Sequence, residues 1–236
     1  MNKSILTRIN EVIREKGFFY VMHYTALGSL NIIKYVLSKL LKKNKFFIFQ
    51  NKKYRYFIHS LTWNGERVVE LPIIINFLNK YKNKKILEVG NVLSTYIHTK
   101  HDILDKYEKY TNVINEDVLT FKSNKKYDLI ISISTLEHVG WDEKPKDTQK
   151  TFLAINNLKK QLSNNGTLIV TLPLGYHPLI DRKIKNKEKI FSKCFFLKRV
   201  SKNNNWKEID LKNLKYIKYN SKYPYANEII IGIINK

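Results

Sequence analysis

The sequence predicts an α/β fold: a mainly parallel, doubly wound sheet with a C-terminal antiparallel hairpin, preceded by an N-terminal extension of helices and a hairpin. Between residues 84 and 175, short apolar segments alternate with helical or polar ones, which is typical of parallel strands joined by crossovers. Two apolar segments near the C-terminus have no long helix after them, so we expect further strands there. With 236 residues, 43% of them apolar, the chain can form one domain with a small appendage.

Residues 1–60 form the expected N-terminal extension. Segments 4–16 and 29–42 have helical periodicity, and the second combines a helical row of leucine, isoleucine and valine with lysines on its other faces. A basic amphipathic helix of this kind lies on a membrane surface or packs on its own protein core. The aromatic-rich run "KFFIFQNKKYRYFIHS", residues 45–60, predicts a β-hairpin that turns around Asn51-Lys52.

Residues 61–236 form the expected α/β domain. A helix should start near Asn64 and be kinked by Pro72. Strands are expected at 84–90, 101–107, 112–118, 127–134 and 166–175, with an amphipathic helix over 147–166 before the last of them. Only a short helix or a loop fits between the first two strands. Segments 195–210 and 227–236 supply the terminal strands.

Polar residues follow each of the five strands, where an open parallel sheet binds its ligands. Gly90 would let a ligand approach the backbone closely, because glycine has no Cβ. Asp105, after the second strand, could accept both hydroxyls of a ribose, and a carboxylate after the third strand could accept from an adenine amine. Residue types suited to a nucleoside therefore gather at one edge of the sheet.

These segments resemble the class I S-adenosylmethionine-dependent methyltransferases of the small-molecule type. The resemblance rests on "ILEVG", "ILDKYE" and "INEDV", and most specifically on "YDLIISISTLEHVG" followed by "NNLKKQLSNNGTLIVTLPLG". It covers about residues 61–236 and implies S-adenosyl-L-methionine as the cofactor.

The resemblance implies a role for each strand-end residue. Glu88 would hold the methionine end of the cofactor, Gly90 would lie under its methionine and ribose, and Asp105 would bind the ribose. The remaining cofactor contacts would come from Leu104 and Tyr107 near the adenine, Asp117 or alternatively Glu116 at the adenine amine, and Ser134 or Thr135 beneath the sulfonium.

The glycine turn departs from the family's pattern. "GNVLST" has one glycine where the family usually has Gly-x-Gly-x-Gly, and Asp105 follows Gly90 by fifteen positions instead of about twenty. Asn91 can adopt a left-handed backbone and stand in for one missing glycine. Nicotinamide binding needs a glycine-rich turn around a pyrophosphate, which is absent. An ordinary βαβ unit with a satisfied Asp105 remains the alternative to a cofactor site.

His138 is the candidate general base, because an ordinary imidazole titrates near neutral pH; its alternative role is to cap the next helix or to hydrogen-bond within the core. Tyr176 and His177 would line the substrate site, and Glu66, Arg67 and Glu70 either reach the pocket or form surface pairs along a helix. The histidine spacing gives no convincing metal set, and the one cysteine excludes a four-cysteine zinc site.

The expected enzyme transfers a methyl group to a small-molecule, saccharide or lipid acceptor. The Asn/Asp-Pro-Pro-aromatic tetrad of nucleic-acid amino-methylating enzymes is absent after the fourth strand, which makes nucleic acid a less favoured partner. The net charge of +23 has two interpretations. It attracts polyanions, or the lysines lie on solvated surfaces without a binding partner. The alternative is a non-catalytic basic protein that binds nucleic acid or membrane. We expect a cytoplasmic protein, with peripheral contact to an anionic inner membrane face as an open possibility.

Overall fold

A computed structural model describes residues 30, 33, 36–37, 40, 45–110 and 112–236. The chain divides into two compact units, residues 1–44 and 45–236. In the first unit the described residues are helical, in agreement with the helix expected over 29–42, whereas the helix expected over 4–16 lies outside the described residues. Within the described part of the chain, every helix is too short or too polar to span a membrane.

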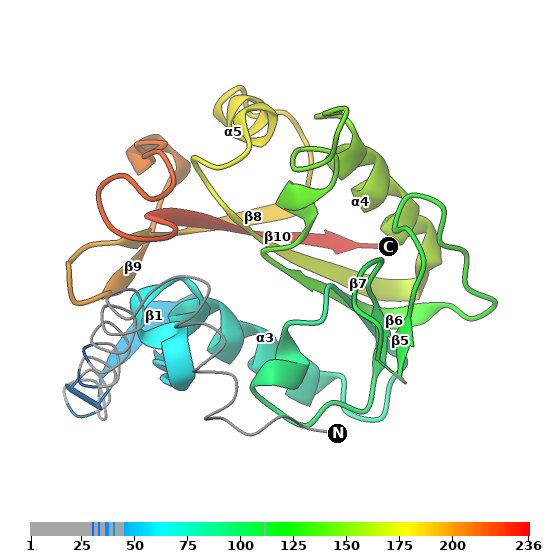
Figure 1. Ribbon diagram of the computed structural model, residues 1–236, viewed down its shortest axis with the longest axis horizontal. Coiled ribbons are helices and arrows are strands. Elements are labelled where there is room, and N and C mark those ends of the chain that lie inside the picture. The colour runs from blue at the N-terminus through cyan, green and yellow to red at the C-terminus, as the bar shows by residue number, and fades with distance from the viewer. Residues whose placement is uncertain (1–29, 31–32, 34–35, 38–39, 41–44, 111) are drawn as a thin grey trace, which may run out of the picture. The chain divides into compact units, whose positions relative to one another are not determined.

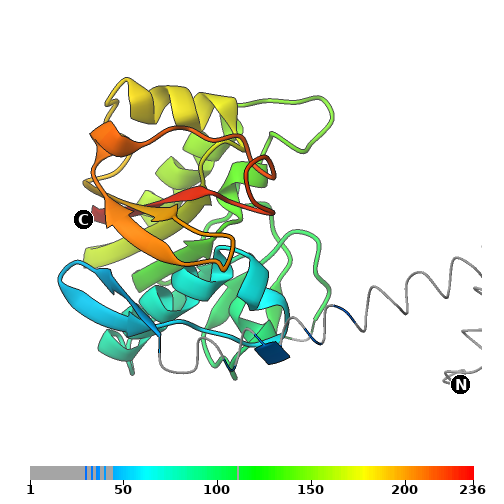
Figure 2. The ribbon, with the colours of Figure 1, turned by 90° about the vertical axis from the view of Figure 1, so that its left-hand side faces the viewer.

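The second unit opens with the expected hairpin, β1 (Phe46–Phe49) and β2 (Lys52–Arg55). Its two-residue turn has positive φ at both Gln50 and Asn51, as a type I′ turn requires. The hairpin lies beside the C-terminal strands in Figure 2, and the rings of Phe49 and Phe195 meet edge to face with centroids 5.5 Å apart. The hairpin expected in the N-terminal extension thus packs with residues 45–236.

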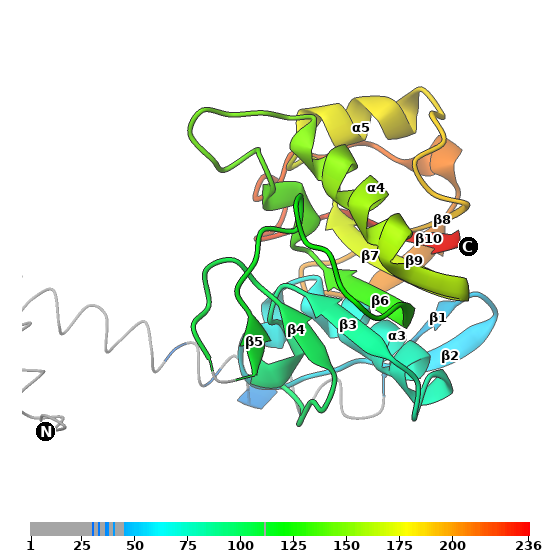
Figure 3. The ribbon, with the colours of Figure 1, turned by 90° about the vertical axis from the view of Figure 1, so that its right-hand side faces the viewer.

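The main sheet has eight strands in the order β5-β4-β3-β6-β7-β10-β8-β9. Its parallel half consists of β3 (Ile86–Val89), β4 (Asp102–Leu104), β5 (Val113–Ile114), β6 (Tyr127–Ile133) and β7 (Leu162–Pro173), side by side in Figure 3. All five coincide with expected strands. The chain runs outward from β3 to β5 on one side and returns through β6 and β7 on the other, so the strand order reverses between β3 and β6.

The C-terminal half of the sheet is antiparallel. Strand β10 (Glu228–Asn235) pairs antiparallel with both β7 and β8 (Lys193–Arg199), and β9 (Trp206–Ile209) pairs antiparallel with β8. The expected antiparallel C-terminal end is confirmed, with the last strand inserted between β7 and β8.

Helices cover both faces of the sheet. In Figure 1, α3 (Arg67–Lys80) lies below it, and α4 (Lys150–Gln161) and α5 (Pro178–Lys185) lie above it. Each face has its own apolar core. Continuous apolar runs such as Leu129–Ile131, all buried, suit a sheet that is covered on both faces.

Several boundaries differ from the expectations. Helix α3 begins at Arg67, because Asn64 ends a 3-10 helix that starts at Ser60; Pro72 lies inside α3. Between β3 and β4 only a 3-10 turn, Leu93–Thr95, is present, as expected. Helix α4 ends at Gln161, earlier than expected, because Leu162 already pairs with Tyr127 and the register shifts before Thr167. Helix α5 was not expected from the sequence.

Candidate active site

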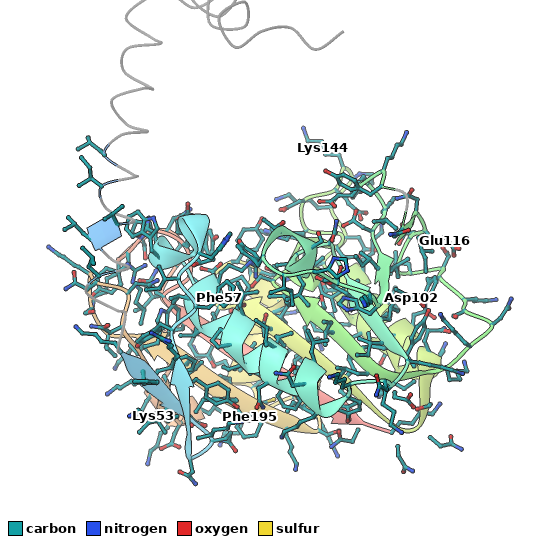
Figure 4. All side chains as sticks on the ribbon, turned by 90° about the horizontal axis from the view of Figure 1, so that it is seen from below. Lys53, Phe57, Asp102, Glu116, Lys144 and Phe195 are labelled. Atoms are coloured by element: carbon teal, nitrogen blue, oxygen red, sulfur yellow. The ribbon has the colours of Figure 1, made fainter. Side chains whose placement is uncertain are left out.

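A cavity of about 370 Å³ lies at the carboxyl ends of β3, β4, β5 and β6, where the strand order reverses. Ligands of open α/β sheets bind at such a point. Its lining includes nine residues predicted from the sequence: Gly90, Leu104, Asp105, Tyr107, Glu116, Asp117, Ser134, Thr135 and His138. Glu116 is labelled in Figure 4. It lies on the same margin of the molecule as Lys144, which belongs to the loop after the 3-10 turn Leu136–His138. The volume lies within the range of small-molecule sites.

Gly90 forms the floor of the cavity directly after β3. Its φ is +83°, and a Cβ built on it would lie 2.4 Å from Oγ1 of Thr135, so only glycine fits here without strain. Asn91 is not in the left-handed region, and our expectation that it replaces a second glycine in this way is wrong. The Asn91 side chain instead donates to Glu108 at 2.6 Å, and it does not line the cavity.

Glu88 lies beneath the turn rather than in the cavity lining. Its carboxylate is fully buried and accepts hydrogen bonds from the amides of Val92 and Leu93 at 2.9 and 2.8 Å. The other oxygen lies 2.8 Å from Nε2 of His101. Glu88 therefore stabilises the short loop that replaces a first helix, and its predicted contact with the cofactor stays a prediction.

Asp105 has one carboxylate oxygen engaged and one available. Oδ1 accepts from the amides of Tyr107 and Glu108 at 2.8 and 2.9 Å. Among the described residues, Oδ2 has no hydrogen-bond partner. Two backbone donors fix the orientation of the carboxylate, so that Oδ2 can accept from a ligand hydroxyl in the cavity.

Asp117, by contrast, has both oxygens engaged. Oδ2 pairs with Lys106 at 2.8 Å, and Oδ1 accepts from the amide of Leu119 at 2.9 Å. Burial raises the pKa of Asp117, but these hydrogen bonds outweigh burial and bring the pKa below its usual value, so the carboxylate is ionised. Glu116 is exposed beside it, and both predicted adenine-side carboxylates border the cavity.

Ser134 and Thr135, which follow β6, form another part of the cavity wall. Ser134 has a positive φ of 39°, which is unusual for a residue with a side chain, and its amide donates to the carbonyl of Thr171 at 2.9 Å. Its hydroxyl donates to the buried carboxylate of Glu70 at 2.6 Å. This wall therefore connects the cavity to helix α3, which carries Glu70.

His138 belongs to a hydrogen-bonded triad on the rim of the cavity. Its Nδ1 lies 2.5 Å from Oδ2 of Asp142 and 3.1 Å from the hydroxyl of Tyr176, which itself donates to Asp142 at 2.7 Å. Despite the effect of burial, the hydrogen bonds from Tyr176 and His138 lower the pKa of Asp142. An ionised Asp142 favours the tautomer with the proton on Nδ1, which leaves Nε2 as a proton acceptor.

His177, the other predicted substrate-side histidine, is fully buried and does not line the cavity. It caps α5, with Nδ1 accepting from the amide of Ile180 at 3.4 Å. Burial lowers the pKa of His177, which keeps its imidazole neutral. In this geometry His177 stabilises the start of α5.

A cluster of buried charged groups lies behind Ser134 and Thr135. We call it the acidic cluster: Glu66, Arg67, Glu70 and Glu137. Arg67 pairs with Glu70 at 2.6 Å, and Glu66 accepts from the amide of Ala226 at 3.1 Å. Burial raises the pKa of Glu66, and it raises that of Glu137 well above its usual value. Of the predicted substrate-side residues, Glu66 is therefore buried and Arg67 half-buried, and neither lines the cavity.

The sequence analysis missed Asp142 and Glu137. Asp142 lies four positions after His138, a spacing that brings side chains together on one helical turn and could have identified the pair. Glu137 precedes His138, and only the packing of α3 against the sheet shows that it is buried. Within the residues that the structure describes, no three histidine, cysteine or acidic side chains lie close enough to hold a metal ion.

No protein-family model matches the chain, and no curated protein matches its sequence. Among solved structures, the N-methyltransferase NodS from Bradyrhizobium japonicum WM9, in complex with S-adenosyl-L-homocysteine, is similar over 72% of this chain and 91% of its own, at 11% identity and a TM-score of 0.41. A SAM-dependent methyltransferase from Archaeoglobus fulgidus is similar over 70% of this chain and 91% of its own, at 14% identity and a TM-score of 0.42. CalS10, an amino pentose methyltransferase from Micromonospora echinaspora, is similar over 42% of this chain and 47% of its own, at 13% identity and a TM-score of 0.30.

Because these identities and TM-scores are low, we assign the fold from the strand order of the sheet. The parallel half of the sheet has the doubly wound strand order, which reverses beside β3. The other half of the sheet consists of the antiparallel strands β10, β8 and β9. The chain thus has a doubly wound, Rossmann-like α/β fold with an antiparallel C-terminal end, as expected from the sequence.

Proposed function

We propose that the protein is an S-adenosylmethionine-dependent methyltransferase acting on a small-molecule, saccharide or lipid acceptor. The observation that carries the proposal is the cavity at the strand-order reversal. Its lining includes Gly90, Asp105 with one free carboxylate oxygen, and the hydrogen-bonded pair His138 and Asp142. The sheet edge that is suited to a nucleoside and the candidate general base His138 therefore border the same cavity.

The residues present fit the cofactor. Asp105 would accept its ribose hydroxyls, Leu104 and Val118 give apolar surface for the adenine, and Gly90 and Thr135 line the cavity where the rest would lie. The narrow, single-glycine turn is compatible because this cofactor has no phosphate to surround. When bound, S-adenosylmethionine supplies an electrophilic methyl group on a sulfonium.

The chain's own residues have two tasks in such a reaction. The cavity walls must hold the acceptor in line with the methyl group, which converts an encounter in solution into an oriented one. His138 would accept the acceptor's proton at Nε2, while Asp142 holds the imidazole in the required tautomer. Tyr176 supports this orientation through its hydrogen bond to Asp142.

Calorimetry with S-adenosylhomocysteine tests the proposal, because it needs no acceptor. We expect binding by the wild-type chain, and Asp105→Ala should weaken it by about 30- to 150-fold, since a charge-assisted pair of hydrogen bonds is worth about 2–3 kcal/mol. Asp210→Ala is the matched control, because Asp210 is exposed and outside the cavity.

An absence of binding by the folded wild-type chain would contradict the proposal and favour a non-catalytic basic protein. Equal affinity in wild type and Asp105→Ala would leave the activity possible but remove Asp105 from the site.

A further inference from the structure

The acidic cluster has more carboxylates than cations. Glu66, Glu70 and Glu137 are 6%, 0% and 1% exposed, and Arg67 is the cation that acts on all three. One guanidinium can neutralise one carboxylate fully, and it does so for Glu70 at 2.6 Å. Glu66 also interacts with Arg199, whereas among the described residues Glu137 has no lysine or arginine in contact, which is costly in a protein interior whenever the acid is ionised.

One atom of the cluster has no partner at all. Oε2 of Glu137 is buried and makes no hydrogen bond, while Oε1 lies 3.7 Å from Nε2 of His138. Buried polar atoms are almost always paired, so an orphaned carboxylate oxygen in a fully buried side chain points to a missing partner. Glu137 sits between the cavity-lining residues Thr135 and His138, which places that partner beside the proposed methyl-transfer site.

The surroundings of the cluster suit an organic cation. The ring of Tyr176 meets that of Tyr219 edge to face, with centroids 5.2 Å apart, and Tyr176 also bonds to His138 and Asp142. The pKa of Tyr219 is raised, first by burial and then by the charges of Glu66 and Glu137. Aromatic rings next to carboxylates bind ammonium groups by combining ring and charge attraction.

We propose that the acidic cluster recognises a positively charged acceptor, and that the preferred substrates are therefore primary or secondary amines. This inference rests on the function proposed above and names the acceptor class of the same site. Glu137 would bind the ammonium as a positioning residue.

The resulting transfer balances. The ammonium nitrogen gives one proton to Nε2 of His138, and its freed electron pair forms the new N–C bond. The C–S bond breaks, and its electron pair stays on sulfur, so the positive sulfonium becomes a neutral thioether. The methylated nitrogen carries the positive charge, and one proton leaves through His138 to solvent.

The test measures binding of matched neutral and cationic probes, with and without S-adenosylhomocysteine. We expect the wild-type chain to bind benzylammonium at least about tenfold more tightly than benzyl alcohol, and glucosamine at least about tenfold more tightly than glucose, because a desolvated charge pair strengthens the contact. Glu137→Gln keeps the shape of the side chain but cannot ionise, so it should remove most of this preference. Glu208→Gln, which changes a half-buried carboxylate on β9 outside the cavity lining, should leave this preference unchanged.

Equal affinity for the neutral and cationic probes, or no binding of the cations, overturns the proposal, and this comparison needs only the wild-type chain. Retention of the full preference in a folded Glu137→Gln chain overturns the role of Glu137. A failure of S-adenosylhomocysteine to bind is a separate result, which counts against the methyltransferase function itself.

Discussion

The orientation of His138 depends on the side chain of Asp142, 2.5 Å from Nδ1. Asp142→Asn would replace an ionised acceptor with an amide that can donate to Nδ1, which favours the opposite tautomer. We expect turnover to fall by about 10²-fold, within the range of general-base effects, with S-adenosylhomocysteine affinity unchanged. His138→Ala should lose at least as much.

Nitrogen-15 chemical shifts of the His138 ring provide a measurement that needs no acceptor. They should show the proton on Nδ1 in wild type and a changed tautomer in Asp142→Asn. An unchanged tautomer together with unchanged turnover would mean that Asp142 does not position the base. Tyr176→Phe, which removes one hydrogen bond but leaves the carboxylate, should have the smaller effect on both readouts.

Asp181 supplies a pH dependence of stability. It accepts from the amide of Gly175 at 3.0 Å, and burial raises its pKa to about 6. Because the folded pKa lies above the unfolded value, the folded state holds the proton more tightly, and stability is lost as pH rises through about 6. Between about pH 4 and pH 6.5 this group should lower the free energy of unfolding by about 2 kcal/mol.

Asp181→Asn retains an acceptor for the amide of Gly175 but cannot titrate. Denaturant unfolding of both chains across this window should show a difference that moves in favour of the variant as pH rises. A constant difference would mean that Asp181 has an ordinary pKa in the folded protein.

Sequence reasoning identifies residues that follow strands, because strand ends in a parallel sheet meet at one edge. Asp105, Ser134 and His138 line one cavity for this reason. It does not identify groups whose environment depends on distant packing. Glu137 becomes a buried acid only because α3 brings Arg67 and Glu70 against the sheet, and nothing in "STLEHVG" shows this.

At the scale of elements, the turn after β3 is the segment on which the cavity depends most. Gly90→Ala would place a Cβ 2.4 Å from Thr135 Oγ1 at a φ of +83°. We expect a loss of about 2 kcal/mol or more in unfolding free energy from strain and overpacking, together with weaker S-adenosylhomocysteine binding.

Gly65→Ala is the matched control for this change. Gly65 has a φ of −125°, and its added Cβ would lie 3.5 Å from the nearest atom, an ordinary contact. Comparable destabilisation by both substitutions, measured by denaturant titration, would show that the left-handed turn at Gly90 is not a special requirement.

Elements with strong local patterns were predictable, and those fixed by neighbours were not. The strands from β3 to β7 are apolar runs bounded by polar residues, and the absence of a full helix before β4 followed from the fifteen positions between Gly90 and Asp105. Helix α5 is short and begins at Pro178 under a buried histidine cap, which is a tertiary feature. The early start of β7 likewise depends on pairing between Leu162 and Tyr127.

At the scale of the whole molecule, the described helical residues of the first unit expose a row of large apolar side chains. Leu30, Ile33, Val36, Leu37 and Leu40 are between 46% and 67% exposed, in a chain with a net charge of +23. Apolar residues at helical spacing in a basic segment favour binding to an anionic lipid surface, where apolar burial and charge attraction add. Such binding would bring the cavity to lipid acceptors or locate the enzyme near its substrate.

We therefore expect the full chain to be retained by vesicles that contain phosphatidylserine, and released as salt rises because exposed charges are screened. Vesicles of phosphatidylcholine alone should retain much less. Leu37→Ser combined with Leu40→Ser removes apolar area without changing the charge, so it should weaken retention and leave S-adenosylhomocysteine affinity intact. Retention that is equal for this variant and for wild type would assign the binding to lysines elsewhere on the chain. A wild-type chain that ignores phosphatidylserine would mean that the positive charge is solvated surface, and that the exposed apolar row has a protein partner or none.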